Sequence, residues 1–138
     1  MKAAVVLFNR DLRVHDNPAL ASAARCEQVV PLFVLDDAIL GSRFAAPNRL
    51  AFLLDSLRDL DESLGDRGAR LVIRRGDPVK EAIGVAKDAG ATEIHVSADY
   101  SAFARARERR LSEACEHERL ELQIHPGVTV VPPGDLTP

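Results

Sequence analysis

The sequence predicts an α/β domain in which a mainly parallel sheet is covered by helices on both faces. Short apolar runs bounded by charged or turn residues alternate with stretches whose apolar residues recur every three or four positions. The first pattern is typical of buried strands and the second of amphipathic helices. The chain begins and ends this alternation with a strand, and parallel neighbours in a sheet need helical crossovers of this kind.

The size and composition are those of one ordinary globular domain. The chain has 138 residues, of which 46% are hydrophobic and 28% charged, so a packed core is expected and disorder is not. The net charge is -3, whereas a free-standing nucleic-acid-binding domain is usually basic. The N-terminal run MKAAVVLF is too short for a signal peptide or a membrane span. We therefore expect a soluble, cytoplasmic protein that reaches DNA, if at all, through another region.

The first half of the chain predicts two strands and two helices. The apolar run Ala3–Phe8 is expected to be a strand buried on both faces. Asp16 or Asn17 is positioned to cap a short helix that has Pro18 at its first position and runs to about Cys26. The second strand is expected at 29–35. From Ala45 a long helix is predicted, closed by Gly65 and Gly68, because its leucines have helical spacing, namely Leu50, Leu53, Leu54, Leu57, Leu60 and Leu64.

The second half adds, in order, a strand within 69–78 that ends in Gly-Asp-Pro, a helix at Val79–Ala89 closed by Gly90, a strand within 92–99, a helix at Phe103–His117 and one or two strands within 120–131. The complete order predicts a Rossmann-like, doubly wound domain with a five-stranded, mainly parallel sheet. In such domains ligands bind beyond the carboxyl ends of the strands. This rule selects the loops after Phe8, Leu35, Arg74 and Ser97.

The first two of these loops carry charged residues, and the role of each of these residues can be interpreted in two ways. No GxGxxG or Walker A pattern follows the first strand, so phosphate binding by a glycine-rich loop is not indicated. Instead Arg10, Asp11 and Arg13 either hold an anionic ligand or pair with one another. After the second strand, Asp36 and its neighbour Asp37 either hydrogen-bond a ligand or cap the next turn. Arg49, at the start of the leucine-rich helix, reaches the same cleft or is simply solvated.

The loop after the fourth strand adds Asp99 and an aromatic residue, Phe103, followed by Ala104. An aromatic next to a small residue suits stacking against a planar ring, although packing in the core is the alternative for Phe103. No nucleophile, metal-ligand or acid-base motif is present, and His95 is expected to be a hydrogen-bonded core histidine. Cys26 and Cys115 have neither metal-site nor framework-disulfide spacing. The residues alone thus predict a binding domain for a planar or anionic small molecule.

The stretch LFNRDLRVHDNPAL resembles the N-terminal signature W-F-R-x-D-L-R-x-x-D-N-x-A-L of the DNA photolyase/cryptochrome family. Five later stretches also look like their family counterparts in the same order, namely LFVLDDAIL, RLAFLLDSLRDLDESL, LVIRRGDP, ARARERR and VVPPGDLTP. Leu7 and Asn9 depart from the tryptophan and arginine of many members. The resemblance covers essentially the whole chain.

The resemblance implies a division of labour between two domains. Photolyases repair pyrimidine dimers in DNA by light-driven electron transfer from FAD, which belongs with the DNA-binding surface to a C-terminal helical domain. This chain looks like the N-terminal domain that holds an antenna chromophore, over 1–131, followed by the start of an interdomain linker at 132–138. We expect the chain alone to be inactive in repair. Its partner would be its own FAD domain, and it would reach damaged DNA only through that domain. No membrane partner is expected. The apolar surface left by a missing domain favours self-association of the chain.

The family uses an 8-hydroxy-5-deazaflavin, a methenyltetrahydrofolate or a flavin such as FMN as antenna. Folate-type members carry an Asn-Glu pair where this chain has Phe103-Ala104, so the resemblance favours the deazaflavin. The residues carried over are Arg10, Leu35, Asp36, Arg49, Asp99 and Phe103. In this assignment Leu35 and Phe103 line the ring, Asp99 bonds its polar edge, and Arg10 and Arg49 balance its negative charge. The alternatives are a cryptochrome-like photoreceptor domain, a stand-alone nucleotide-binding module of Rossmann-like fold, and a purely structural domain.

Overall fold

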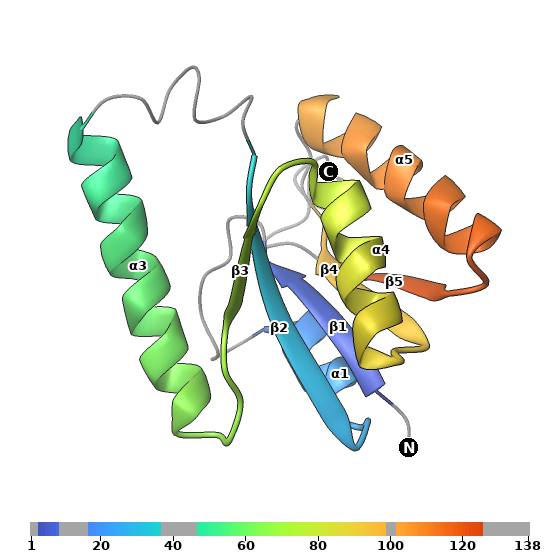
Figure 1. The fold of residues 1–138 in the computed structure, drawn as a ribbon, viewed down its shortest axis with the longest axis horizontal. Helices are drawn as coiled ribbons and strands as arrows, with labels where there is room; N and C mark the ends of the chain where they lie inside the picture. The colour runs from blue at the N-terminus through green and yellow to red at the C-terminus, as the bar shows by residue number, and fades with distance from the viewer. Residues whose placement is uncertain (1–2, 9–16, 37–46, 99–101, 126–138) are drawn as a thin grey trace, which may run out of the picture.

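The fold was analysed in a computed structural model that describes residues 3–8, 17–36, 47–98 and 102–125 (Figure 1). Its elements are, in order, β1 (Ala3–Phe8), α1 (Pro18–Ala23), β2 (Gln28–Leu35), α3 (Pro47–Gly65), β3 (Val72–Arg75), α4 (Pro78–Ala89), β4 (Glu93–Ser97), α5 (Ala102–His117) and β5 (Glu121–His125). This order confirms the predicted alternation of strands and helices. No helix in this part of the chain is long and apolar enough to cross a membrane.

The strands form one five-stranded sheet in the order β3-β2-β1-β4-β5, and all four pairings are parallel. The central strand β1 pairs with β2 on one side and with β4 on the other; Leu7, for example, lies between Leu32 and Val96. The chain winds outward from β1 in one direction to β3, then crosses back to continue with β4. The strand order therefore reverses between β1 and β4, which is the position where doubly wound folds bind ligands.

Two apolar layers cover the two faces of the sheet, and β1 contributes alternate residues to both. Ala3, Val5 and Leu7 belong to the layer shared with α4 and α5. The intervening side chains of β1, Ala4, Val6 and Phe8, pack with residues of α1 and α3. Figure 1 shows α4 and α5 together on one side of the sheet, with α1 behind it. Burial of the entire strand confirms the interpretation of AAVVLF as a two-sided core strand.

Local side-chain hydrogen bonds define where the short helices begin. Asn17, and not Asp16, is the N-cap of α1, and its Oδ1 accepts a hydrogen bond from the Leu20 amide at 3.1 Å. The helix ends at Ala23, earlier than predicted, because the chain turns tightly there and the Cys26 amide donates to the Ala23 carbonyl. α4 is capped by Asp77 at its start and by left-handed Gly90 (φ 67°) at its end, as predicted for the glycine.

The leucine spacing of the long helix α3 is confirmed as helical, but only some of its leucines are buried. Leu57, Leu60 and Leu64 are buried in the layer shared with α1, whereas Leu54 is 46% exposed and neighbouring Phe52 is 75% exposed. The sheet therefore contacts the C-terminal half of α3 most closely. Beyond Gly65 the chain turns through Gly68, whose φ of 83° favours a residue without a side chain. Side chains 47–50, including Leu50, lie outside the described residues.

Candidate functional site

The fold places the candidate ligand site at the carboxyl edge of the sheet, around the ends of β1 and β4. β1 ends at Phe8 and β4 at Ser97, and the helices that follow them, α1 and α5, return over opposite faces of the sheet. Loops 9–16, 37–46 and 99–101, which follow β1, β2 and β4, lie outside the described residues. The predicted ligand residues Arg10 and Asp99, with Asp11, Arg13 and Asp37, are in these loops and stay predictions.

Two of the predicted residues, Leu35 and Asp36, stand at this edge in the structure. Leu35 is the last residue of β2, is half-buried and packs against the layer beneath α1 and α3. Its carbonyl accepts the Gly76 amide at 2.9 Å, which ties the end of β2 to the turn after β3. Asp36 follows it directly and is also half-buried. An apolar residue and an acidic residue that are adjacent in the sequence therefore lie together at this edge of the sheet.

The backbones of two further predicted residues lie in the first turns of helices. Arg49 is the third residue of α3, and Phe103 is the second residue of α5, which starts soon after the carboxyl end of β4. Their side chains lie outside the described residues, so their proposed contacts remain predictions. Ala104 is buried, with 1% of its surface exposed. A small side chain inside the protein therefore follows Phe103 in the first turn of α5.

The charged residue in the turn after β3, Asp77, has a structural role. The Asp77 carboxylate accepts the Lys80 amide at 3.3 Å as the N-cap of α4. The same carboxylate atom accepts a hydrogen bond from the Arg110 guanidinium of α5 at 2.8 Å. This ion pair fastens α4 to α5 at the end of the sheet where the ligand is expected. Gly76 precedes the cap with a φ of 138°, a backbone conformation that disfavours other residues.

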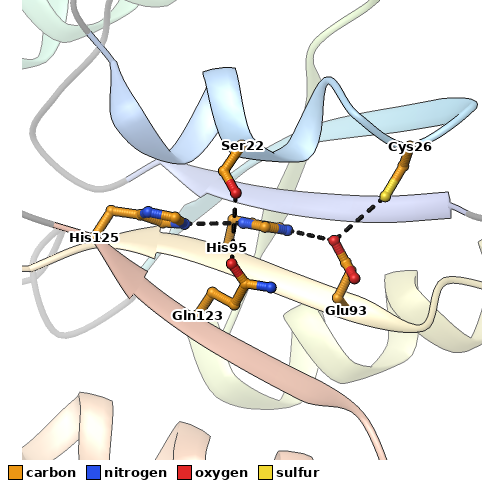
Figure 2. Close-up of polar contacts among 6 residues, drawn as sticks. All are labelled: Ser22, Cys26, Glu93, His95, Gln123 and His125. Carbon is orange, nitrogen blue, oxygen red and sulfur yellow. Dashed lines mark hydrogen bonds and ion pairs between the residues drawn. The ribbon is translucent and has the colours of Figure 1, made fainter.

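A group of buried polar side chains lies on the face of β4 and β5 that α1 covers (Figure 2). Nε2 of His95 lies 2.7 Å from Oε1 of Glu93, and Nδ1 of the same ring lies 3.0 Å from Nε2 of His125. The Cys26 thiol donates to the same Glu93 oxygen at 3.3 Å. We call Cys26, Glu93, His95 and His125 the buried polar chain. His95 is fully buried, which confirms the prediction of a hydrogen-bonded core histidine.

The buried polar chain is not arranged as a catalytic triad. The Cys26 thiol donates to the Glu93 carboxylate, and a neighbouring negative charge disfavours the thiolate form that a nucleophile needs. Burial raises the pKa of the other thiol, Cys115, to about 11, which keeps it protonated and unreactive. Both cysteines are thiols outside any disulfide, and no group of three or more potential metal ligands occurs within the ranges described.

The pairing of His95 with His125 was not predicted, although the sequence carries a signal for it. In EIHVS and ELQIH, polar and apolar residues alternate, which places the polar ones of each strand on one face. The register then sets Glu93 opposite Glu121 and His95 opposite Gln123. The α1 face of these two strands is consequently polar, and Ser22 of α1 contacts Gln123 at 3.5 Å (Figure 2).

Comparisons with known proteins agree with the fold and also find a matching family model and similar sequences. The family model described as DNA photolyase matches residues 4–138. A deoxyribodipyrimidine photo-lyase of Streptomyces griseus is 48% identical over 140 aligned residues, which cover 100% of this chain and 31% of that protein. The chain thus spans about a third of the length of this relative.

Two solved structures show the same architecture at lower identity. A Synechocystis cryptochrome is 25% identical with a TM-score of 0.89, covering 99% of this chain and 30% of that chain. An archaeal photolyase from Sulfolobus tokodaii is 28% identical with a TM-score of 0.80, covering 94% of this chain and 30% of that chain. That photolyase was solved with two FAD molecules, which implied a novel light-harvesting cofactor.

Proposed function

This chain belongs to the DNA photolyase family, and from that premise we propose that it is the antenna-chromophore-binding domain of a light-dependent DNA-repair enzyme. The observation that carries the proposal is the family match over residues 4–138 together with 48% identity to a deoxyribodipyrimidine photo-lyase. The chain corresponds to about a third of that relative, so the repair reaction is proposed for the full-length enzyme. In that enzyme a C-terminal domain would hold the catalytic FAD and contact damaged DNA.

We propose 8-hydroxy-5-deazaflavin as the antenna, bound at the carboxyl edge of the sheet. Leu35 and Asp36, half-buried at the end of β2, have the chemistry that a planar heterocycle with a polar edge requires. Buried Ala104 supports this choice over a folate, because it supplies no carboxylate for a pterin amide edge. The assigned partners Arg10, Arg49, Asp99 and Phe103 complete the proposed site.

When bound, an antenna absorbs light and passes the excitation energy to the flavin across space. The domain therefore needs to hold it in a fixed orientation and to exclude water, and needs no acid-base chemistry of its own. The rigid parallel sheet supplies that orientation, because Leu35 is fixed by strand pairing and by the hydrogen bond to Gly76.

Two alternatives to this proposal have a specific observation in their favour. The two FAD molecules of the archaeal photolyase favour a flavin as the light-harvesting group in some relatives, and the same cleft would hold it here. The likeness to a cryptochrome favours a photoreceptor domain of the same fold. The first alternative predicts tighter binding of FMN or FAD than of the deazaflavin.

Absorption spectroscopy of the purified chain tests the chromophore assignment. The chain is titrated separately with 8-hydroxy-5-deazaflavin, methenyltetrahydrofolate, FMN and FAD. We expect the deazaflavin to bind tightest, with a red shift and sharpening of its visible band as it leaves water. Preference for the folate would contradict the interpretation of Phe103-Ala104, and preference for a flavin would select the first alternative.

Paired variants of one helix test the location of the site. Arg49→Ala is expected to weaken deazaflavin binding about tenfold or more, because a charge-assisted hydrogen bond contributes about 1.5–3 kcal/mol. Arg58→Ala is the matched control, since Arg58 lies on the same helix with 74% of its side chain exposed. Equal affinities of the two variants would show that Arg49 is not in the site. Asp99→Ala is tested in the same way.

Repair assays test the division between domains. The chain alone, with added FAD and illumination, is expected to leave pyrimidine dimers in DNA unrepaired, whereas the full-length enzyme repairs them. Clear repair by the chain alone would contradict the assignment of the FAD and DNA sites to a separate domain.

A further inference from the structure

The two helices that share one face of the sheet, α4 and α5, are joined by ion pairs at both ends of α4. At its start, the Arg110 guanidinium of α5 donates a hydrogen bond to the Asp77 carboxylate at 2.8 Å. At its other end, Lys87 pairs with Glu118, which follows α5 directly. The two helices therefore run in the same direction along the sheet.

The positions of these ion pairs show that α5 extends past the start of α4. Asp77 is the N-cap of α4, whereas its partner Arg110 lies about two turns into α5. The first two turns of α5, residues 102–109, therefore project by about 12 Å beyond this contact, toward the carboxyl edge of the sheet. Figure 1 shows α5 beginning beyond the first turn of α4. The projecting segment contains the backbone of Phe103 and the buried Ala104.

The turn that carries Asp77 is also tied to the other side of the candidate site. The amide of Gly76, immediately before it, donates to the carbonyl of Leu35, the last residue of β2, at 2.9 Å. Asp77 is itself held in place, because the Lys80 amide donates to the same carboxylate oxygen that Arg110 contacts. One turn therefore connects the end of β2 with the projecting segment of α5.

Apolar packing by itself does not specify the position of the projecting segment along the helix axis. Ala104 and Leu111 are buried on one side of α5, but hydrophobic contact has no preferred direction. A charge-assisted hydrogen bond is short and directional, so the contact between Arg110 and Asp77 fixes α5 relative to the turn. Such a pair is suited to setting a position, even though exposed ion pairs contribute little to stability.

We propose that Asp77 and Arg110 are positioning residues for the antenna chromophore: their ion pair holds the first two turns of α5 at a fixed place relative to the end of β2. The inference rests on the proposed function, in which residues of both segments contact the chromophore. Asp77 and Arg110 themselves act only through those segments. A site that is already ordered before binding loses less free energy on binding, so loosening one side lowers the affinity and the order of the bound chromophore.

The ion pair at the other end of α4 provides a matched control. Lys87 and Glu118 have side-chain exposures of 59% and 23%, close to the 56% and 27% of the pair at Asp77, but they lie at the amino edge of the sheet. Removing either pair should therefore have a similar, small effect on stability. A difference in chromophore binding between Arg110→Ala and Lys87→Ala thus reports positioning and not stability.

Titration with the chromophore that the wild-type chain binds tightest tests the proposal. Arg110→Ala is expected to weaken binding about three- to fivefold, within the range that an exposed ion pair supplies, and to lower the fluorescence anisotropy of the bound chromophore. Lys87→Ala should keep the wild-type values. An Arg110→Ala chain with wild-type affinity and anisotropy would overturn the positioning role alone. A wild-type chain that binds none of the four chromophores would overturn the proposed function and this role with it.

A double-mutant cycle tests whether the two residues act together. Asp77→Asn keeps an oxygen that caps α4 but removes the charge that Arg110 contacts. It is expected to weaken binding by no more than Arg110→Ala does, and the double variant should bind like Arg110→Ala alone. Losses that add in the double variant would overturn the proposal, because they would show that the two residues act independently.

Hydrogen exchange tests the fastening of α5 without any chromophore. Amides 106–109 are the first in α5 that donate to carbonyls of the same helix. They should exchange faster in Arg110→Ala than in Lys87→Ala, because only the first variant releases the projecting segment. Equal exchange of these amides in the two variants would overturn the fastening and the positioning role that depends on it.

Discussion

The two faces of β4 are both buried but are built from opposite kinds of side chain. Ile94 and Val96 face α4 and α5 and join an entirely apolar layer. Glu93, His95 and Ser97 face α1 and are equally inaccessible to water, with exposures between 0 and 8%. The strand thus packs one face by excluding water from hydrocarbon and the other by hydrogen-bonding polar groups to one another.

The difference between the two faces of β4 indicates which residues contribute most to the stability of the fold and which make that stability depend on pH. The stability of an apolar layer depends mainly on the volumes of its side chains. Close-packed neighbours neither make room for a larger side chain nor fill the cavity that a smaller one leaves. A buried polar group responds to changes of charge, since an unpaired polar group in the interior is costly. The polar face also connects to the end of the sheet at which the ligand is proposed to bind. Substitutions on the two faces of β4 should therefore differ in size and in pH dependence.

The largest effect is expected on the apolar face. Ile94→Ala should lower the free energy of unfolding by about 2–5 kcal/mol, because it leaves a cavity at a fully buried position. Urea denaturation measures the change. Ile124→Ala is the control, since Ile124 lies on the neighbouring strand with 46% of its surface exposed and should cost much less. Similar losses for both variants would contradict the packing described for this face.

A smaller loss is expected when only charge is removed from the polar face. Glu93→Gln keeps an oxygen acceptor for His95 and should cost about 1–3 kcal/mol, the range for hydrogen bonds to buried charged groups. Glu121→Gln is the matched control, because Glu121 is paired with Glu93 in register but is exposed on β5. Unfolding midpoints in urea compare the two. A Glu93→Gln chain as stable as wild type would show that the carboxylate is not charged in the fold.

Mild acid should destabilise the chain through His125. Its pKa is lowered in the folded state, so the unfolded chain binds the proton first and stability falls as the pH drops below about 6.5. The loss should stay under about 1 kcal/mol, because the ring is only half-buried and solvent screens it. Unfolding measured from about pH 7.5 to 5.5 checks the slope, above the range where carboxylates titrate. A rise in stability over this interval would contradict the assigned direction.

The smallest effect is expected at the contact between α4 and α5, outside the sheet. Arg110→Ala removes the ion pair with Asp77, whose partners are 56% and 27% exposed, and should cost about 0.2–1 kcal/mol. The loss should shrink at high salt, which screens exposed charges. Arg109→Ala, at an exposed neighbouring position, serves as the comparison. A salt-independent loss would indicate that the Arg110 stem contributes by packing instead.

Sequence reasoning predicted the fold well because its signals are local. The apolar run of β1, the Asn17 and Pro18 start of α1 and the Gly90 end of α4 each depend on residues a few positions apart. The leucine spacing also predicted the long helix α3, although it did not tell which leucines are buried: Leu54 is 46% exposed, whereas Leu57 is buried. Within the candidate site, the strand end at Leu35 and Asp36 followed from the same local patterns. The contacts of Arg10 and Asp99 stay predictions.

By itself, the sequence determined the order of the elements and their approximate bounds, since backbone hydrogen bonds, caps and hydrophobic periodicity act over short stretches. Only the tertiary structure decided that β4 crosses back to pair with β1 and that β5 follows it. That choice brings Cys26 to Glu93 and His95 to His125, across 67 and 30 residues of sequence. The alternation of polar residues in β4 and β5 indicates a polar face on each strand, but it does not tell which residues meet, because they meet only when separate crossovers pack on one face of one sheet. The buried polar chain is therefore a property of the assembled fold.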